Sequence, residues 1–523
     1  MTSKLPARPL SELLAGLDVR LPASDPLVSG VAFDSRRVRP GFLYVGLPGT
    51  SKHGAAFAGK AATAGAAALL TDVAGARLIE SEGLATPPVA MVEDARYAMA
   101  IASCRSYGQP AQAMTSLGVT GTNGKSTTVL MLAAALDGAG RRVGSIGTLG
   151  FLVGGEPLEL DRTTITTPES PDLQATLAMM LDRGADTVAM EVSSHALSLQ
   201  RVAGIRFDVV GFTNLGRDHL EFHHTIEEYF AAKARLFTPD HADRAVINGD
   251  AEAGRRLLQQ AADLGLPAVS VGFSAGCSYR VTQWQPSGSG SSFTLVHPNG
   301  TIEAAICLPG DYNVVNAATA LAMIDQAGLD MSAALPGLAR AVIPGRMQPV
   351  DLPTANGSAA PRVYVDFAHT PQAISSALDA LNHPALASAR VLVVLGAGGD
   401  RDPDKREPMG RAAAQGADVV VVTDDNPRSE DPAIIRSRVL AGARSAIDAA
   451  EPGSRLAAVE LLDGGERRAA IGQALRLARP GDAIAVLGKG HERTQQLDDE
   501  TIEFDDVEVV REQWARIIAE GKS

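Results

Sequence analysis

A glycine-rich loop between a predicted strand and a predicted helix constrains the fold of this chain more than any other feature. Ser116–Thr120 has the apolar, β-forming pattern of a strand. The segment Gly118-Val-Thr-Gly-Thr-Asn-Gly-Lys125-Ser126 leads from that strand into a helix predicted over Thr127–Leu136, which ends at Gly138. This order is that of a phosphate loop, whose backbone N–H groups surround phosphate oxygens at the start of a helix. A plain glycine-rich turn is the alternative, and the Lys-Ser ending argues against it.

The side chains of the loop suit a nucleoside triphosphate. Lys125 would place a positive charge beside the terminal phosphates, and the Ser126 hydroxyl would bind Mg²⁺. The strict spacing GxxxxGK[ST] is not met, because Val119 stands where the first glycine belongs. The residues that we expect to bind ATP here are Gly121, Thr122, Asn123, Gly124, Lys125, Ser126 and Thr127.

Short apolar runs alternate with helical patterns on both sides of the loop, which predicts a doubly wound parallel sheet. The strand-like runs are Val143–Ile146, Thr187–Met190, Val209–Phe212 and Ala245–Ile247. One segment differs, because Pro298-Asn299-Gly300 separates two β-forming runs and predicts a hairpin with an Asn-Gly turn. The two arms of this hairpin are Phe293–His297 and Thr301–Leu308.

Length and two Gly/Pro-rich segments predict three domains. A chain of 523 residues exceeds one ordinary domain. The segments Tyr107-Gly108-Gln109-Pro110 and Ile343-Pro344-Gly345-Arg346 have the composition of linkers. We expect an α/β protein with a smaller mixed α/β N-terminal domain, a central doubly wound phosphate-loop ATPase domain and a C-terminal Rossmann-like α/β domain. The expected domains span residues 1–112, 113–343 and 344–523.

Strands are also predicted in the outer two domains. The first domain has short runs at Gly30–Phe33 and Phe42–Val45. In the last domain, polar or glycine-rich residues follow every predicted strand, and ligands of open α/β sheets bind beyond the carboxyl ends of strands. Ordinary loop composition is the alternative, although all of these strands share the feature. The strands are Val363–Val365, Val391–Leu395, Val419–Val422 and Ile484–Leu487.

Composition excludes several classes of protein. The formal net charge is −13 at pH 7 without a basic stripe, which argues against nucleic-acid binding. No apolar run approaches the roughly 18 residues of a membrane span, and Glu12 interrupts the short apolar stretch near the N-terminus, unlike a signal peptide. The cysteines, at 104, 277 and 307, show no CxxC spacing. We expect a cytoplasmic monomer that binds small molecules, with no nucleic acid and no membrane insertion.

The loop in the form TGTNGK[ST] resembles that of the Mur ligases and the related folylpolyglutamate synthases. The resemblance covers essentially the whole chain, because further motifs follow in the order of the family. They are Glu191-Val-Ser-Ser-His195-Ala-Leu, Asn214-Leu-Gly-Arg-Asp218-His219-Leu, Gly310-Asp-Tyr-Asn313-Val-Val-Asn316-Ala, Pro344-Gly345-Arg346-Met-Gln and Asp366-Phe-Ala-His369-Thr-Pro.

The resemblance implies roles for single residues of these motifs. Glu191 ends a strand beside the phosphate loop, where a carboxylate can bind Mg²⁺. His219, at the end of the next strand, resembles a second metal ligand; a structural histidine is the alternative. Asn313 resembles the residue that contacts adenine, Arg346 one that reaches the phosphates, and Asp366 one that holds the ribose.

Lys233 lies on the apolar face of a predicted helix. Thr225-Ile-Glu-Glu228 resembles a capping box, and Ile226, Phe230 and Phe237 share a face with Lys233. An inward lysine resists protonation, and a neutral amine can react with CO₂ to form an anionic carbamate. A lysine that extends along the core to reach solvent is the alternative. The stretch Tyr229-Phe-Ala-Ala-Lys233-Ala-Arg-Leu-Phe237 resembles that of the family's carbamylated lysine, a metal ligand.

The N-terminal segment Phe33-Asp34-Ser35-Arg36-Arg37-Val-Arg-Pro-Gly41 resembles the uridine-nucleotide binding turn of the Mur ligases that make the muramoyl tripeptide. Folylpolyglutamate synthases lack this domain. Some relatives carry Asn and Gln where this chain has Ile165 and Leu199, so no contact is expected there. The residues implied to bind the UDP-muramoyl dipeptide are Ser35, Thr166, Thr167, Ser193 and Arg201.

A C-terminal motif points to the amino acid. Asp425-Asn426-Pro427-Arg428 matches the DNPR motif of the Mur ligases that add diaminopimelate, whereas lysine-adding relatives lack the arginine. A guanidinium can clamp the distal carboxylate that distinguishes diaminopimelate from lysine. A surface ion pair of Arg428 with Glu430 or Asp431 is the alternative. The residues implied to bind diaminopimelate are Arg401, Asp425, Asn426, Pro427, Arg428, Gly488 and Glu492.

The resemblance implies an ATP-dependent ligase with Mg²⁺. ATP would phosphorylate the D-glutamate carboxylate of UDP-N-acetylmuramoyl-L-alanyl-D-glutamate, and the amine of meso-diaminopimelate would attack the acyl phosphate. A lysine-adding ligase is the first alternative. A non-catalytic nucleotide-binding switch is the second, and the polar C-terminal sheet edge argues against it.

Overall fold

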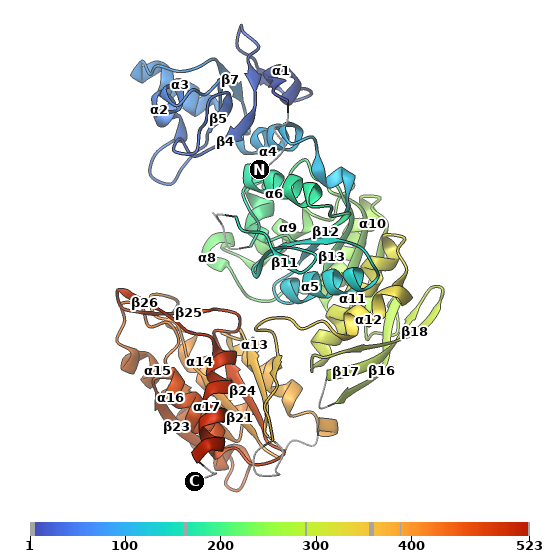
Figure 1. The fold of residues 1–523 in the computed structure, drawn as a ribbon, viewed down its shortest axis with the longest axis vertical. Coiled ribbons are helices and arrows are strands. Elements are labelled where there is room, and N and C mark those ends of the chain that lie inside the picture. Colours follow the sequence, from blue (N-terminus) through green and yellow to red (C-terminus); the bar gives the residue numbers. More distant parts are fainter. Residues whose placement is uncertain (1–5, 161–165, 288–289, 355–359, 387–388, 521–523) are drawn as a thin grey trace. The chain divides into compact units, whose positions relative to one another are not determined.

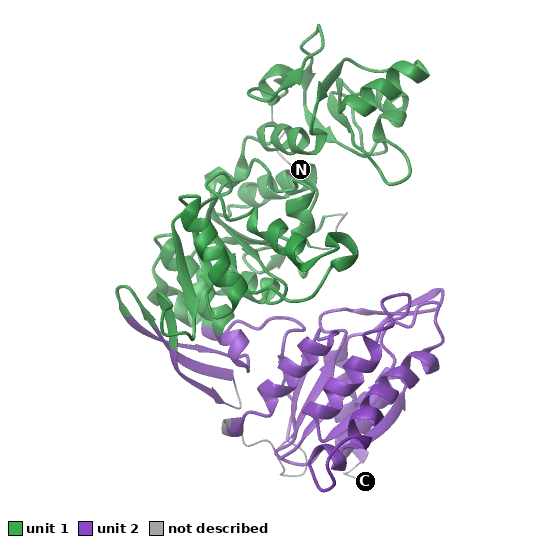
Figure 2. Cartoon of the chain, turned by 180° about the vertical axis from the view of Figure 1, so that it is seen from behind, with its two compact units in different colours: residues 1–281, 296–300, 315–338 green, residues 282–295, 301–314, 339–523 purple. Residues whose placement is uncertain are grey.

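The computed structural model describes residues 6–160, 166–287, 290–354, 360–386 and 389–520. Ile165, where no contact is expected, lies outside these residues. The chain forms two compact units, one of residues 1–281, 296–300 and 315–338 and the other of residues 282–295, 301–314 and 339–523 (Figure 2). Among the described residues, no helix has the length and apolar character needed to cross a membrane.

The N-terminal part has a five-stranded sheet of order β2-β7-β6-β5-β4, in which only β2 runs antiparallel to its neighbour. Its strands are β2 (Val19–Arg20), β4 (Gly30–Ala32), β5 (Phe42–Gly46), β6 (Ala68–Thr71) and β7 (Val89–Val92), and a separate pair is β1 (Arg8–Pro9) and β3 (Leu27–Val28). The helices are α1 (Leu10–Leu13), α2 (Ala58–Thr63), α3 (Val73–Glu82) and α4 (Ala95–Ser106). Apolar residues of α1, α4 and the sheet form its core.

The central sheet has the order β11-β10-β9-β12-β8-β13-β14-β15-β16-β17-β18. Figure 1 labels β11, β12 and β13 of this sheet. The strands from β9 to β16 in this order are parallel to their neighbours, whereas β10 runs antiparallel to β9 and β11. Since β8 lies between β12 and β13, the loops after these strands meet at one edge. The bounds are β8 (Thr115–Thr120), β9 (Val143–Gly147), β10 (Gly150–Val153), β11 (Glu156–Pro157), β12 (Thr187–Glu191), β13 (Phe207–Phe212), β14 (Ala242–Asn248), β15 (Ala268–Gly272), β16 (Tyr279–Ser287), β17 (Gly290–His297) and β18 (Gly300–Ile306).

Helices alternate with the parallel strands, and α5 packs against β9 and β12. Apolar residues of these strands are buried in the core. This explains why the strands appear in the sequence as short apolar runs. The helices are α5 (Lys125–Gly138), α6 (Ser170–Asp182), α7 (Ser194–Ser198), α8 (Leu220–His223), α9 (Ile226–Ala234), α10 (Glu252–Asp263), α11 (Asp311–Gln326) and α12 (Met331–Ala339).

The C-terminal part has a six-stranded sheet of order β19-β20-β24-β21-β22-β23, parallel except for β19. Its strands are β19 (Gln348–Val350), β20 (Arg362–Asp366), β21 (Val391–Leu395), β22 (Val419–Thr423), β23 (Glu460–Gly465) and β24 (Ala483–Leu487), and a hairpin follows as β25 (Thr494–Leu497) and β26 (Glu500–Glu503). The helices are α13 (Pro371–Leu381), α14 (Arg406–Gly416), α15 (Pro432–Asp448), α16 (Arg467–Leu477) and α17 (Asp506–Glu520).

The α/β class, the parallel central sheet and the C-terminal alternation are therefore confirmed. The predicted hairpin exists, because β17 and β18 are neighbours that flank Pro298 and Asn299. The prediction for His219 was wrong in one respect, because this residue does not end a strand. It lies after a loop that follows β13 and immediately precedes α8.

Candidate active site

The glycine loop between β8 and α5 has a backbone that only glycine permits at two points. Gly121 has φ 151° and Gly124 has φ 85°. A Cβ on Gly121 would lie 1.9 Å from Oγ1 of Thr213, and one on Gly124 would lie 2.5 Å from Oδ1 of Asn316. The loop therefore requires glycine for both conformation and space.

The loop after β13 holds the glycine loop in place. The N–H of Thr122 donates to the Asn214 carbonyl (2.9 Å), and the N–H of Asn123 donates to Oδ1 of Asn214 (2.9 Å). The Thr213 hydroxyl donates to the Asn123 carbonyl (2.6 Å). The glycine loop is thus preorganised by its neighbour, which lowers the entropic cost of binding phosphate.

Two lysine side chains converge on one carbonyl of the loop. Nζ of Lys125 donates to the carbonyl oxygens of Gly121 and Thr122, both at 2.9 Å. Nζ of Lys233 donates to the same Gly121 carbonyl at 2.8 Å. Two ammonium groups that donate to the same carbonyl oxygen would repel each other. The arrangement therefore favours a neutral amine on the lysine that is more buried.

Lys233 is the more buried of the two, with 1% of its surface exposed. Burial, and next the charge of Lys125, holds the pKa of Lys233 well below its usual range. Its Nζ lies 4.3 Å from the centre of the Tyr229 ring. The sequence correctly placed Lys233 on a buried face with Phe230 and Phe237, but Ile226 is 40% exposed because it occupies the first helical turn.

The start of α9 follows the sequence. The Thr225 hydroxyl accepts a hydrogen bond from the N–H of Glu228 at 3.1 Å, which caps the helix. This cap fixes where α9 begins and therefore which face carries Lys233.

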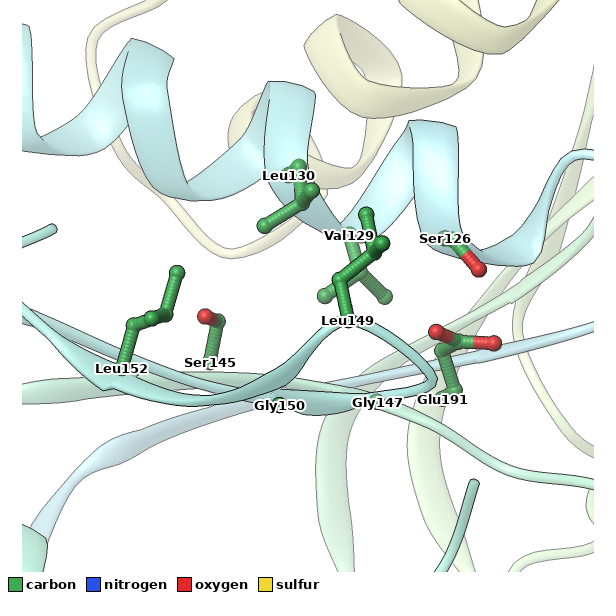
Figure 3. Close-up of a pocket in the computed structure, with 9 residues that line it drawn as sticks. All are labelled: Ser126, Val129, Leu130, Ser145, Gly147, Leu149, Gly150, Leu152 and Glu191. Atoms are coloured by element: carbon green, nitrogen blue, oxygen red, sulfur yellow. The ribbon is translucent and has the colours of Figure 1, made fainter. Parts of the chain in front are cut away.

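Glu191 and Ser126 face the same pocket (Figure 3). Glu191 ends β12 and is 2% exposed. Its carboxylate accepts from the N–H of Thr148 at 2.7 Å and from the Thr148 hydroxyl at 3.3 Å. The pocket lies between α5 and the β9–β10 turn, and its walls include Val129 and Leu149. The Glu191 carboxyl group therefore lies in the same pocket as the Ser126 hydroxyl, in the first turn of α5.

His219 belongs to a ring cluster. Its ring centre lies 4.8 Å from that of His195 and 6.1 Å from that of Tyr229. His219 has φ 54°, a left-handed conformation that directs the chain into α8. Burial, and then the neighbouring histidines, lowers the pKa of His195 to about 4. Nε2 of His223 lies 2.9 Å from the hydroxyl of Ser194.

The oxygen atoms in this pocket suit Mg²⁺ in part. No group of three or more His, Cys, Asp or Glu side chains within the described ranges is arranged to hold a metal. A buried carboxylate on Glu191 and a hydroxyl on Ser126 nevertheless lie in one pocket, and oxygen ligands with retained waters suit Mg²⁺. The donor set fits Mg²⁺ through these two residues, while the structure places His219 and Lys233 among aromatic rings instead.

The dipeptide-binding candidates of the central part lie near one another. The Thr167 hydroxyl donates to the Glu191 carbonyl (2.9 Å) and accepts from the N–H of Ser193 (3.1 Å). The Thr166 hydroxyl lies 3.2 Å from that of Thr148. Nη1 of Arg201 donates to the Thr167 carbonyl at 3.1 Å. These four residues therefore line the strand end that also carries Glu191.

Ser35, the remaining candidate, is partly exposed in the turn after β4. In that turn Arg36 pairs with Asp34 at 2.7 Å, and the guanidinium of Arg36 holds the pKa of the Asp34 carboxyl below its usual value. Arg37 pairs with Asp172 of α6 at 2.8 Å.

Glu169 is a buried carboxylate that sequence reasoning missed. It pairs with Arg201 at 2.9 Å and with Arg96 of α4 at 3.2 Å. The sequence carried no sign of these pairs, because their members are far apart along the chain.

Asn313, Arg346 and Asp366 belong to the second unit. The Asp366 carboxylate accepts from the N–H groups of Met347 and Ala368, each at 2.7 Å. Burial raises the pKa of Asp366, and the charge of Arg346 opposes that rise. Asn313 is buried, and its Nδ2 donates to the Pro309 carbonyl at 2.7 Å.

The DNPR loop follows β22. Arg428 has φ 53°, and its Nη1 donates to the Gly399 carbonyl at 2.6 Å while its Nε donates to Oε1 of Gln496 at 2.9 Å. Among the described residues no carboxylate pairs with Arg428, and Glu430 pairs with Arg406 at 2.8 Å instead. The alternative of a surface ion pair with Glu430 or Asp431 therefore has no support in the structure.

The other amino-acid candidates lie in or beside the DNPR loop. Nδ2 of Asn426 donates to Oε2 of Glu492 at 2.9 Å. A Cβ on Gly488 would lie 3.0 Å from Oδ2 of Asp425, so a side chain there would crowd the carboxylate. Pro427 is buried, and Arg401 is exposed on the loop after β21, whose Gly398 lies beside Arg428. The predicted group is thus brought together, with Arg401 at its margin.

Lys489 is a second residue that sequence reasoning missed. It is fully buried, and its Nζ lies 3.0 Å from Oδ1 of Asn426 and 3.2 Å from Oε2 of Glu492. Lys489 lies in the sequence between Gly488 and Glu492, two residues that the sequence assigned to the amino-acid site, and this position could have identified it.

Comparison with known proteins agrees with this arrangement. Family models match residues 27–104 (Mur ligase family, catalytic domain), 119–324 (Mur ligase middle domain) and 345–490 (Mur ligase, glutamate ligase domain). The UDP-N-acetylmuramoyl-L-alanyl-D-glutamate–2,6-diaminopimelate ligase of Streptomyces avermitilis is 43% identical over 512 residues, which cover 97% of this chain and 96% of that one. The ligase of the same name from Corynebacterium glutamicum is 44% identical over 474 residues, covering 90% and 88%.

A solved structure shows the same relationship. The structure of a UDP-N-acetylmuramoyl-L-alanyl-D-glutamate–2,6-diaminopimelate ligase superposes with a TM-score of 0.70 at 30% identity and covers 98% of this chain and 99% of that one. Sequence and fold therefore agree along nearly the full length. The chain belongs to the Mur ligase family.

Proposed function

We propose that this chain is the ATP-dependent ligase that adds meso-2,6-diaminopimelate to the D-glutamate of UDP-N-acetylmuramoyl-L-alanyl-D-glutamate, a step in the synthesis of peptidoglycan precursors. The observation that carries the choice of amino acid is Arg428, a guanidinium fixed by Gly399 and Gln496 and free of any carboxylate partner among the described residues. The relatives of the same name support the reaction.

ATP would bind at the start of α5. The N–H groups of Gly121–Thr127 face the phosphates in this assignment, and Lys125 balances the charge that develops as the phosphoryl group moves to the D-glutamate carboxylate. We assign Asn313, Arg346 and Asp366 to the nucleotide's adenine, phosphates and ribose. The short bonds of Asp366 to two backbone N–H groups support this, because they orient its carboxylate.

The amine of diaminopimelate then attacks the acyl phosphate, an amide bond forms, and inorganic phosphate leaves. The amine must lose protons for this step.

The dipeptide would be held by Ser35, Thr166, Thr167, Ser193 and Arg201, of which the last four lie beside the end of β12.

Ser126 and Glu191 would hold Mg²⁺, which supplies charge neutralisation for phosphoryl transfer when bound. We propose that Lys233 carries a carbamate and, with His219, completes the metal site. The depressed pKa and burial of Lys233 support the modification, because only the neutral amine reacts with CO₂. A carbamate would also replace the repulsion between Lys125 and Lys233 by an attraction.

At the amino-acid end, Arg428 and Arg401 would bind carboxylate groups of diaminopimelate. Asp425, Asn426, Gly488 and Glu492 would receive its distal amine and backbone. Bidentate pairing of guanidinium with carboxylate gives geometric selectivity over lysine, which has no distal carboxylate. Pro427 shapes the turn that presents Arg428.

We propose domains over residues 1–112, 113–343 and 344–523, which the ranges of the family matches support. We also propose that the protein acts in the cytoplasm, where ATP and UDP-linked precursors occur, and that it acts as a monomer.

The experiment that tests the reaction is release of inorganic phosphate from ATP by the purified protein. A ligase should release phosphate only when the UDP-dipeptide and diaminopimelate are both present, and the product should be the UDP-tripeptide by mass. A non-catalytic nucleotide-binding switch should bind ATP but release no phosphate when the two substrates are added. Phosphate release that is independent of both would reject the proposal.

A further inference from the structure

Lys489 lies at the centre of the polar cluster after β24, and the assignments above give it no role. Its side chain is fully buried, which is rare for lysine. Besides Asn426 and Glu492, its Nζ lies 3.7 Å from Oδ1 of Asp425. Lys489 is therefore the cation between two carboxylates whose exposed fractions are 9% for Asp425 and 35% for Glu492.

A chain of hydrogen bonds leads from Lys489 to the guanidinium of Arg428. Oδ1 of Asn426 accepts from Nζ of Lys489 (3.0 Å) and from the N–H of Gln496 (3.0 Å). Both donors require the Asn426 oxygen on that side, so its Nδ2 must face Glu492, as it does at 2.9 Å. Oε1 of Gln496 then accepts from Nε of Arg428 at 2.9 Å.

The backbone of the β25–β26 hairpin supports the same contact. The N–H of Arg428 donates to the Gln496 carbonyl at 3.2 Å, and the N–H of Asp498 donates to the Arg428 carbonyl at 2.8 Å. With Nε and Nη1 both engaged, the direction of the guanidinium is fixed, and its Nη2 makes no hydrogen bond with any described residue.

We propose that Lys489 and Gln496 are positioning residues for the amino-acid substrate: Lys489 orients Asn426 and Glu492, and Gln496 transmits that orientation to Arg428. The inference rests on the proposed function, because it assumes that Arg428 binds the distal carboxylate of diaminopimelate. Neither residue needs to touch the substrate. The formal charges of Asp425, Glu492 and Lys489 sum to minus one, which suits a substrate ammonium.

The test compares Lys489→Met and Gln496→Met with the wild-type enzyme in steady-state assays of phosphate release. Each variant should raise the KM for meso-diaminopimelate about tenfold or more, since misdirecting a binding group by about 1 Å has large effects. The KM values for ATP and UDP-dipeptide should stay within about twofold. Glu503→Gln, at the far end of the same hairpin and exposed, is the matched control and should change none of them.

A purely structural role for Lys489 would lower the melting temperature and change all KM values together or none. Gln496 is exposed, so Gln496→Met keeps the test valid if Lys489→Met does not fold. An unchanged KM for diaminopimelate in Gln496→Met, or in folded Lys489→Met, would overturn the inference while the wild-type activity leaves the proposed function intact. A wild-type enzyme that does not use diaminopimelate would reject the proposed function and this role together.

Discussion

Lys125 and Lys233 donate to the same carbonyl of Gly121 but have different expected tasks. Lys125 opens α5 and is partly exposed. We expect Lys125→Ala to abolish ligation and to leave the fold intact, because the loss of a phosphate-binding charge raises the barrier by several kcal/mol. Phosphate release measures the effect, with Lys52→Ala at an exposed site as the control. Turnover above about a tenth of wild type would contradict the assignment, since tenfold corresponds to only about 1.4 kcal/mol.

For Lys233 the prediction concerns a modification. Lys233→Ala should be nearly inactive, and added acetate or another short carboxylate should restore part of the activity by taking the place of the carbamate. Mass spectrometry and crystallography with ample bicarbonate should show the modified lysine. A plain amine by both methods would refute the carbamate.

The depressed pKa of Lys233 also predicts a dependence of stability on pH. The folded pKa lies below that of the unfolded chain, so the unfolded state binds more protons in the interval between them. Unmodified Lys233 therefore makes stability rise with pH through that interval. Lys233→Met should lack this contribution, which denaturant unfolding between pH 7 and about pH 10 measures. Parallel pH profiles of the wild-type and variant proteins in the absence of bicarbonate would contradict the burial argument.

Among the elements, α4 and the loops around α6 and α7 are joined by one buried carboxylate. Glu169 pairs with Arg96 and Arg201. Glu169→Gln should lower the free energy of unfolding by about 2–3 kcal/mol, because two partly buried guanidinium groups lose their counter-charge. Asp186→Asn is the control, because its pair with Arg141 is half-exposed and should contribute less than about 1 kcal/mol. If denaturant unfolding gave equal losses of unfolding free energy for both variants, burial would not determine how much an ion pair contributes to stability.

The elements also show what the sequence could predict. Runs such as Val391–Leu395 and Val419–Val422 are buried on both faces of a parallel sheet, so their sequences are continuously apolar and easily recognised. The edge strand β23 was missed, because Glu460–Gly465 is partly exposed and has only two consecutive apolar side chains, Leu461 and Leu462. The hairpin β10–β11 was also missed, since its second strand has only two residues.

The same contrast applies to the candidate site. The glycine loop was predictable because its residues are contiguous and its backbone demands glycine. Contacts between distant segments could not be predicted. The hydrogen bond from Thr148 to Glu191 and the ion pair of Glu169 with Arg201 depend on how the strands are ordered. Lys489 was missed because a lysine in a glycine-rich segment normally faces solvent.

In the whole molecule, a chain with a net charge of −13 must bind anionic substrates through local groups. We propose that the glycine loop at one sheet edge and the Arg428 cluster at another are such groups. The central claim is that the second cluster selects diaminopimelate, and the alternative is a lysine-adding ligase.

The measurement that tests this claim most directly is kcat/KM for meso-diaminopimelate and for L-lysine with saturating ATP and UDP-dipeptide, in wild type and Arg428→Ala. Wild type should prefer diaminopimelate. Arg428→Ala should raise the KM for diaminopimelate by roughly two to four orders of magnitude, because losing a charged bidentate pair costs about 2–5 kcal/mol. The KM values for ATP and UDP-dipeptide should change only slightly. A wild-type preference for L-lysine, or unchanged diaminopimelate kinetics in Arg428→Ala, would contradict the account.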